Sequence, residues 1–309
     1  IASYPELSCT KDAVNYHVRS GEPIIDWSKG LPPFALLDNT LCPANEKVYN
    51  FLDKVFTEVA ALFPFEYIHI GGDECSKNYW EKSDAIKALM KREGLKNMEE
   101  VQSYFVKRVG KIIESKGKKF IGWDEILEGG HAPGAAVMSW RGMKGGIEAA
   151  KQNHEVVMSP TDFAYLDYMQ GDSAIESKVY ASLSLKKAYQ FDPMPPGVNP
   201  KLIKGGQGNL WTEQIYNNRY RQYMLWPRGM AVAEAVWSEP GRRDWGSFVT
   251  RVENQLPRLE EANVKYAPSM FEPTISVSKD NKGQLWVTLN TEVEDLDIHY
   301  SFDNSFPDY

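Results

Sequence analysis

The sequence lacks the features that mark several common classes of protein. It holds only three cysteines and five histidines in 309 residues, and its net charge is −7. An acidic chain does not offer the general basic surface that a nucleic-acid partner needs, and no apolar run approaches the roughly 20 residues of a membrane span. Three cysteines are no disulfide framework. Cys9 and Cys42 lie in loop-like sequence, where they either pair or stay reduced.

Motifs for metals and cofactors are also missing. No His-x-x-x-His or paired-cysteine spacing occurs, and residues 205–208 match neither phosphate-loop pattern. We therefore expect no metal and no cofactor. Residues 1–5 show no charged and then apolar signal pattern and no initiator Met, so we expect the chain to begin inside a longer gene product.

What the chain does contain is an alternation of short apolar strands with helices. Residues 1–45 are rich in Pro and Gly and indicate a long loop. Helices are expected near 45–62, 97–115, 145–152, 217–237 and 244–262, and strands at 65–70, 119–123, 135–140 and 155–159, with a fifth ending at 208–211. Asn97 can cap the second of these helices, and Pro227 is expected to kink or split the fourth. The alternation is typical of parallel βα units.

The pattern changes after Pro273. Alternating strands are expected at 274–277, 285–289 and 297–300, with a turn at 280–283 joining the first two. We therefore expect an α/β part over residues 1–271 and the beginning of a small, β-sandwich-like antiparallel module over residues 272–309.

Polar and aromatic residues gather where the predicted parallel strands end. In chain order they are Asp73, Glu74, Trp123, Trp140, Tyr165, Asp167, Trp211 and Glu213. In a parallel α/β barrel these ends share one face, where the active site lies. Carboxylates supply acid–base chemistry, and aromatic faces are platforms on which sugar rings stack. The pattern therefore favours attack on a glycosidic bond.

The adjacent carboxylates Asp73 and Glu74 are the sharpest of these features. Two neighbouring carboxylates repel each other, which raises the pKa of at least one of them. A raised pKa keeps a carboxyl protonated, as a general acid needs. The alternative is structural: Asp73 caps the following helix and Glu74 is its solvated neighbour.

The other aromatic residues have a simpler interpretation. A Trp lies in the core more often than on a sugar platform, and this is the position expected for Trp27, Trp80, Trp226, Trp237, Trp245 and Trp286. His69 is a candidate for substrate binding. Its alternative is to pack against the strand or to orient a neighbouring group.

Residues 69–74 resemble the His-x-Gly-Gly-Asp-Glu signature of glycoside hydrolase family 20, the β-N-acetylhexosaminidases. Further segments are similar to that family, in the same order, over about residues 1–262; they are residues 4–9, 122–125, 139–142, 165–167, 209–213 and 226–228. The resemblance, which is to chitobiase-like members, implies a (β/α)8 TIM barrel, with residues 1–271 as part of the catalytic domain. It implies exo-removal of terminal β-linked N-acetylglucosamine or N-acetylgalactosamine.

The resemblance also implies substrate-assisted catalysis, in which the acetamido oxygen of the substrate attacks the anomeric carbon and gives an oxazoline. Glu74 would be the general acid and base, Asp73 would stabilise the acetamido nitrogen, and Tyr165 would donate to the acetamido oxygen. Trp123, Trp140 and Trp211 would wall the acetamido pocket, and Asp167 and Glu213 would bind sugar hydroxyls. The partners would be N-acetylhexosamine-terminated glycans or chitooligosaccharides.

The sequence departs from the family in its strand count. Only five βα strands are expected, and residues 4–9 resemble a segment that follows the third strand of the family barrel. Strands 4–8 are therefore expected here, without the first-strand arginine that binds the sugar. The first half would come from the full-length protein or from another chain.

The resemblance leaves Cys75 free and Cys9–Cys42 as the one disulfide to expect. That pairing fits a periplasmic or secreted protein, with outer-membrane association as an alternative. Three other functions remain open at this point: a glycan-binding module without catalysis, a fragment without function, and a lacto-N-biosidase-like enzyme that releases a disaccharide.

Overall fold

The computed structural model describes residues 5–9, 40–130, 132–172, 176, 179, 181–303 and 305–307. It divides into two compact units, the first made of Ile1–Met158 and Met194–Gly205 and the second of Ser159–Pro193 and Gly206–Tyr309. Most of the predicted loop and the predicted core position of Trp27 lie outside the described residues.

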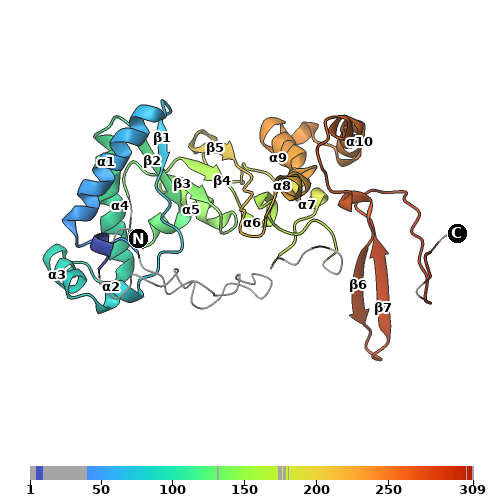
Figure 1. Cartoon of the computed structure of the whole chain (residues 1–309), viewed down its shortest axis with the longest axis horizontal. Coiled ribbons are helices and arrows are strands. Elements are labelled where there is room, and N and C mark those ends of the chain that lie inside the picture. The colour runs from blue at the N-terminus through green and yellow to red at the C-terminus, as the bar shows by residue number, and fades with distance from the viewer. Residues whose placement is uncertain are drawn as a thin grey trace. The chain divides into compact units, whose positions relative to one another are not determined.

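The first unit alternates strands and helices as predicted (Figure 1). Its elements are η1 (Pro5–Leu7), α1 (Glu46–Leu62), β1 (Tyr67–His69), α2 (Asn78–Lys82), α3 (Asp84–Glu93), α4 (Met98–Glu114), β2 (Lys119–Trp123), η5 (Asp124–Leu127), β3 (Ala136–Ser139), α5 (Lys144–Lys151), β4 (Val156–Met158), η6 (Pro200–Leu202) and β5 (Ile203–Gly206), of which Gly206 falls in the second unit.

Strands β1 to β5 form one sheet in chain order. β1 pairs with β2, β2 with β3 and β3 with β4, each pair in parallel, with Ile68 opposite Phe120 and Gly122 opposite Val137. Parallel neighbours joined by helices are the arrangement of a (β/α)8 barrel. The predicted fold class is confirmed, with five such strands in the described part of the chain.

Helix α4 covers this sheet and begins as the sequence predicts. The side chain of Asn97 accepts a hydrogen bond from Glu100 N at 2.8 Å, and the Glu100 carboxylate accepts one from Lys96 N. These two bonds satisfy backbone donors that the first turn of a helix leaves free. α4 packs on β2 and against α1. The position of the helix is thereby fixed from both sides.

The described residues on either side of the loop before α1 are joined by a disulfide and by a backbone hydrogen bond. Cys9 and Cys42 form a disulfide, and Cys75 is free. Leu7 O accepts a hydrogen bond from Cys42 N at 3.0 Å. Both expectations about the cysteines are confirmed.

The second unit is mainly helical and ends in a hairpin. Its elements are α6 (Thr161–Ala164), α7 (Leu185–Tyr189), α8 (Asn218–Leu225), α9 (Arg228–Trp237), η7 (Pro240–Arg242), α10 (Trp245–Glu261), η8 (Ser269–Phe271), β6 (Thr274–Lys279) and β7 (Leu285–Asn290). The predicted helix over 217–237 is split at Pro227, as its missing N–H leads one to expect. No helix of the described residues has the length and apolar character to cross a membrane.

Two predicted strands are wrong. The fifth strand is Ile203–Gly206, and in the predicted segment only Asn209 forms a bridge, a parallel one to Tyr165. The backbone of Asn209 makes both hydrogen bonds of this bridge: its N–H donates to Ala164 O, and its C=O accepts from Leu166 N. The predicted strand at 297–300 has no ladder partner among the described residues.

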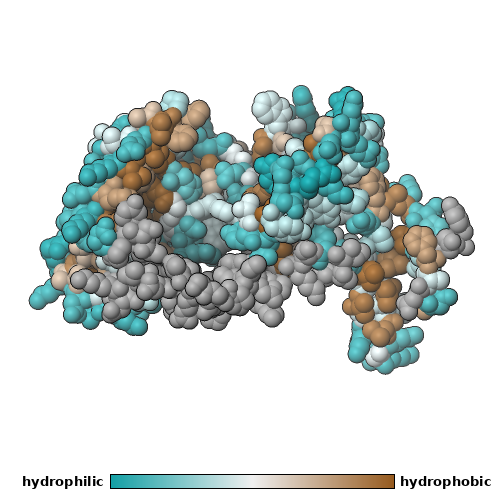
Figure 2. Space-filling view, in the orientation of Figure 1, coloured by the Kyte–Doolittle hydropathy of each residue, from teal (hydrophilic) through white to brown (hydrophobic). Residues whose placement is uncertain are grey.

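The core position predicted for two tryptophans is also wrong. Trp237, at the end of α9, is 91% exposed, and Trp286, on the hairpin, is 58% exposed. β6 and β7 pair with each other alone among the described strands, so the apolar side chains of the hairpin lie on its surface (Figure 2). Trp80 does lie in the core, as predicted. The boundary predicted at 271/272 precedes this hairpin and stays a prediction.

Candidate active site

The predicted site residues are distributed over both units. The first unit holds His69, Asp73, Glu74, Trp123 and Trp140, and the second holds Tyr165, Asp167, Trp211 and Glu213. Each unit brings its own members together.

The segment after β1 is a turn built on two glycines with positive φ. Gly71 and Gly72 have φ of 71° and 97°, a region that side chains disfavour. A Cβ on Gly72 would lie 2.6 Å from the side chain of Ile126. Trp123 N donates to Gly71 O at 2.9 Å, and the Gln102 amide donates to Gly72 O at 2.8 Å. Both carbonyls of the turn are thus held in place.

This turn presents the two adjacent carboxylates on the surface of the first unit. Asp73 and Glu74 are both exposed, and Glu74 has a φ of 44°. Such backbone strain in a residue other than glycine is concentrated at functional sites. The next helix, α2, begins at Asn78 and has Lys77 as its N-cap. The alternative in which Asp73 caps that helix is therefore wrong.

His69, the exposed last residue of β1, contacts the turn. Its Nδ1 accepts a hydrogen bond from Gly71 N at 3.0 Å, and its ring meets that of Trp123 edge-on, with centroids 5.0 Å apart. Desolvation lowers the pKa of His69, against the opposing charge of Asp73. Because Nδ1 accepts from Gly71 N, the neutral imidazole carries its proton on Nε2. Its predicted contact with substrate stays a prediction.

Trp123 and Trp140 share one apolar cluster in the first unit. Trp123 is buried, and Trp140 packs beside it, partly buried, against Ile121, Ala136 and Met138. These contacts bring together two of the three tryptophans that the strand ends predict.

Sequence reasoning missed two carboxylates that hold Trp140. The Trp140 indole N–H lies 2.9 Å from Glu125 Oε2, and Trp140 N donates to Asp124 Oδ2 at 3.0 Å. Burial raises the pKa of Glu125 to about 7, while the Trp140 hydrogen bond works to lower it. The signal was present in the sequence as a Trp-Asp-Glu run at a strand end. For Gln102, which holds the turn, the sequence offers no signal.

In the second unit, Tyr165 and Trp211 lie together. The ring centroids of Tyr165 and Trp211 are 6.4 Å apart. The ring of Tyr168 packs against that of Tyr165, with centroids 5.6 Å apart. Tyr165 is buried, whereas Trp211 is 42% exposed. Trp211 therefore places a partly exposed indole beside the buried Tyr165.

Asp167 is a buried carboxylate with an unused oxygen. Its Oδ1 has no hydrogen-bond partner among the described residues. Burial raises the pKa of Asp167 to about 6, with Glu213 adding negative charge, while backbone amides of Asp167 and Trp211 donate to it and lower the pKa. An unsatisfied buried acceptor is costly. The burial of Asp167 thus carries a free-energy cost that the described residues do not offset at Oδ1.

A fully buried arginine, which sequence reasoning did not assign to the site, holds the segment around Asp167. The Arg228 guanidinium donates to the backbone carbonyls of Leu166 at 2.5 Å, Tyr168 at 2.9 Å, Leu183 at 2.8 Å and Met224 at 2.9 Å. Burial lowers the pKa of Arg228 to about 10. Four carbonyls thus replace the solvation of one cation, and two of them flank Asp167.

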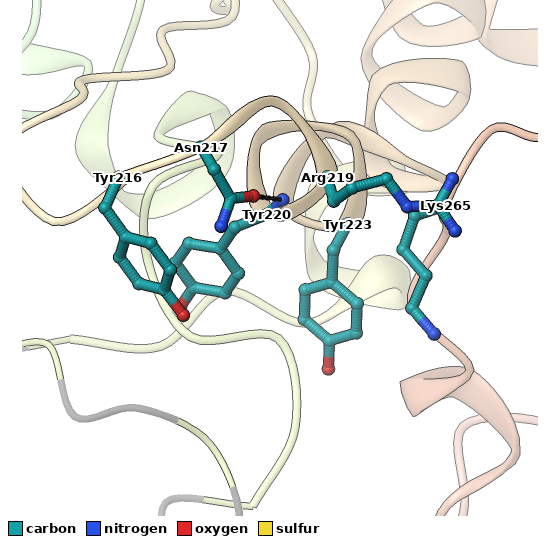
Figure 3. A pocket seen from close by; sticks show the side chains of 6 residues that line it. All are labelled: Tyr216, Asn217, Arg219, Tyr220, Tyr223 and Lys265. Atoms are coloured by element: carbon teal, nitrogen blue, oxygen red, sulfur yellow. Dashed lines mark hydrogen bonds between the residues drawn. The ribbon is translucent and has the colours of Figure 1, made fainter.

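A cavity of about 360 Å³ in the second unit lies apart from the predicted residues (Figure 3). Tyr216, Tyr220 and Tyr223 stack along it, with successive ring centroids 5.3 and 6.0 Å apart, next to Arg219 and Lys265. None of the predicted site residues lines this cavity. Among the described residues no three His, Cys, Asp or Glu side chains gather as metal ligands would.

Known proteins similar to this chain share one family. A β-hexosaminidase of Porphyromonas gingivalis is 39% identical over 271 residues, which are 86% of this chain and 33% of that protein. The structure of a family 20 exo-β-N-acetylglucosaminidase from Vibrio harveyi, in complex with N-acetylglucosamine, matches 75% of this chain and 37% of its own, with 35% identity and a TM-score of 0.67. The Flavobacterium johnsoniae chitobiase matches 85% of this chain and 37% of its own, with 30% identity and a TM-score of 0.66.

The chain spans about a third of the length of the first curated relatives it matches. Its residues 1–240 match the model of the glycosyl hydrolase family 20 catalytic domain. With the parallel sheet and the strand-end residues described above, this match shows that the chain belongs to glycosyl hydrolase family 20.

Proposed function

We propose that this chain is the catalytic part of a retaining exo-glycosidase that removes terminal β-linked N-acetylglucosamine or N-acetylgalactosamine. The observation that carries the proposal is the Asp73–Glu74 pair, exposed on a glycine turn whose two carbonyls are held by Trp123 and Gln102. A rigid backbone under a solvent-facing carboxylate suits proton transfer to a bound leaving group.

Glu74 is the general acid in the first step and the general base in the second. It protonates the glycosidic oxygen as the bond to the anomeric carbon breaks. It then removes a proton from the water that attacks the same carbon. Two inversions at the anomeric carbon give net retention.

The nucleophile in the first step is the acetamido oxygen of the substrate, which forms a five-membered oxazoline with the anomeric carbon. Asp73 accepts the acetamido N–H and stabilises the positive charge that develops there. An intramolecular nucleophile needs only to be held in its attack geometry, and this supplies a large share of the barrier reduction. The mechanism needs no nucleophilic side chain.

The remaining predicted residues bind the sugar. Tyr165 donates to the acetamido oxygen, and Trp123, Trp140 and Trp211 wall the acetamido group. Asp167 and Glu213 accept hydrogen bonds from sugar hydroxyls. The buried Oδ1 of Asp167, which has no partner among the described residues, supports this role.

The substrates proposed are glycans or chitooligosaccharides that end in N-acetylhexosamine. The test uses the full-length protein with two aryl glycosides, the N-acetyl-β-glucosaminide and the β-glucoside. Because the glucoside lacks the acetamido nucleophile, only the first should be hydrolysed, and a thiazoline mimic of the intermediate should inhibit strongly. Equal rates on both glycosides would contradict substrate assistance. Release of a disaccharide from a longer glycan would instead identify a lacto-N-biosidase, and binding without hydrolysis a glycan-binding module.

We also propose that the protein works in the periplasm or outside the cell. The Cys9–Cys42 disulfide supports this location, because disulfides persist in oxidising compartments. Fractionation of the native cells should recover the protein outside the cytoplasm, with the peptides of Cys9 and Cys42 linked by a disulfide in mass spectrometry. Recovery in the cytoplasm with Cys9 and Cys42 reduced would contradict the proposal.

A further inference from the structure

Two adjacent buried carboxylates, Asp124 and Glu125, accept hydrogen bonds from the main chain and the side chain of Trp140. The indole Nε1 lies 3.1 Å from Glu125 Oε1 and 2.9 Å from Oε2. Asp124 Oδ2 accepts from the backbone N–H of Trp140 at 3.0 Å and from that of Arg141 at 3.3 Å. Both carboxylates are buried, so neither is a solvated surface charge.

We propose that Asp124 and Glu125 form a clamp that fixes the orientation of Trp140, and that both are positioning residues for the N-acetylhexosamine ring. The inference rests on the proposed function, because it takes Trp140 as a wall of the acetamido pocket. The clamp itself is a property of the first unit, and it can be tested without substrate.

A hydrogen bond at the indole N–H adds a directional constraint that apolar packing does not supply. Trp140 is only partly buried, and its apolar neighbours Ile121, Ala136 and Met138 belong to one cluster. Side-chain torsions have several staggered or broad minima. A charge-assisted hydrogen bond to the one polar atom of the indole selects among them.

The cost of burying the clamp is offset by Arg141. Its Nε donates to Asp124 Oδ1 at 2.6 Å and lies 3.7 Å from Glu125 Oε1, while Nη1 donates to Glu128 at 2.8 Å. A buried charge without such a partner would be strongly destabilising. Gly145 adds the space that Asp124 needs, since a Cβ there would lie 2.8 Å from Oδ2. The surroundings are thus built to keep both carboxylates next to Trp140.

Burial raises the pKa of Glu125 to about 7, but the clamp does not depend on one protonation state. A protonated carboxyl still has an oxygen that accepts from the indole. A glutamine at this position keeps such an oxygen, whereas a leucine of similar size does not. The two substitutions therefore separate the hydrogen bond from the packing of the side chain.

The kinetic test compares Glu125→Leu, Glu125→Gln and Glu148→Gln in the full-length protein on an aryl N-acetyl-β-glucosaminide. Because a small misplacement of a substrate-positioning group can cost about 100-fold, kcat/KM should fall by about that factor in Glu125→Leu. Glu125→Gln should stay within about fivefold, as a neutral acceptor replaces a charged one. Glu148→Gln, at an exposed position of α5, should match the wild type.

Trp140→Phe provides a background in which the clamp has no indole N–H to hold. There, Glu125→Leu should cost less than about fivefold in kcat/KM, against about 100-fold in the wild-type background. If Glu125→Leu does not fold, Glu125→Met takes its place, because it fills similar space without a carboxylate acceptor. An additional loss equal to that in the wild-type background would overturn the clamp.

A spectroscopic measurement on the same full-length protein needs no substrate. The indole N–H resonance of Trp140, assigned by its absence in Trp140→Phe, should move upfield in Glu125→Leu because the carboxylate acceptor is gone. An unmoved resonance would overturn the clamp, and so would wild-type kcat/KM in folded Glu125→Leu. Absence of hydrolysis by the wild type would overturn the proposed function instead, so the two failures are distinguishable.

Discussion

The carboxylates of the two units are held in opposite ways. In the first unit Asp73 and Glu74 are exposed, and they follow two glycines at positive φ, with backbone strain at Glu74, whose φ is 44°. In the second unit Asp167 is buried, and its segment is held by hydrogen bonds from Arg228 to the carbonyls on either side.

In the proposed function, this difference separates carboxylates that act on the reacting atoms from a carboxylate that binds a sugar hydroxyl. A carboxylate that must give and take a proton benefits from access to the reacting atoms, so rigidity is built into its main chain. A carboxylate that recognises a hydroxyl benefits from burial, because a buried acceptor left without a partner is costly. Glu125 resembles Asp167 because it is also buried, and it accepts a hydrogen bond from the indole N–H of Trp140.

The largest effect is expected for Glu74→Gln. Loss of general acid catalysis should lower kcat/KM of the full-length protein by about 10³-fold or more on an oligosaccharide. The loss should be smaller on a nitrophenyl glycoside, whose leaving group needs less protonation. Glu81→Gln, on α2 and exposed, is the control. Equal losses on both substrates would show that Glu74 is not the acid.

Arg228→Met should produce the largest loss of stability. Four carbonyls that now accept from the guanidinium would be left unsatisfied in the interior. We expect a loss of about 4 kcal/mol in the free energy of unfolding, measured in urea. Arg221→Met, at an exposed position of α8, should change little. If both variants unfold alike, the second unit does not depend on its buried cation.

The pH dependence of stability should distinguish the two buried carboxylates. The pKa of Glu125 is raised from 4.5 to about 7 and that of Asp167 from 3.8 to about 6, chiefly by burial. The folded state therefore binds more protons than the unfolded state in these windows, and stability falls as the pH rises through them. Each full shift corresponds to roughly 3 kcal/mol.

Urea unfolding between pH 3.5 and 8 checks these windows, and the pH values follow from the two shifts. The stability of the wild type relative to Glu125→Gln should decline between about pH 4.5 and 7, and relative to Asp167→Asn between about pH 3.8 and 6. Glu253→Gln, exposed on α10, is the control. Flat differences would mean that neither carboxylate is desolvated in the protein.

The smallest effect on stability is expected for alanine substitutions at two glycines, one in the turn after β1 and one at the end of helix α3. Gly72→Ala adds a Cβ 2.6 Å from Ile126, whereas Gly94→Ala, also at positive φ, meets nothing within 4 Å. We expect Gly94→Ala to lose about 1 kcal/mol of stability and Gly72→Ala about 2 kcal/mol more, because overpacking is added. Equal losses in urea unfolding would show that the turn has room to relax.

Much of this fold follows from local sequence signals. Asn97 and Glu100 mark the start of α4, and Pro227 marks the break between α8 and α9, because each acts on backbone groups within a few residues. The strand Ile203–Gly206 was missed, since its lysine and two glycines form neither an apolar run nor an alternation. The exposed Trp237 illustrates a second limit, because the hydrophobicity of a residue does not tell which face of its helix is covered by other elements.

The site shows the same division between local and distant signals. The strand-end pattern picks out Glu74 and Trp140, because chemistry-bearing residue types stand out wherever a strand ends. The contacts of Gln102 with Gly72 and of Arg228 with Leu166 and Tyr168 join residues far apart in the chain. Sequence spacing carries no information about such pairs, and their geometry emerges only when the chain is folded.

The most direct test of the central claim follows the first product of hydrolysis. Proton NMR of the full-length protein acting on chitobiose shows which anomer of N-acetylglucosamine leaves the non-reducing end before mutarotation. A retaining, acetamido-assisted enzyme with Glu74 as acid and base should release the β-anomer first. Initial release of the α-anomer would contradict it, because a single inversion leaves no place for an oxazoline.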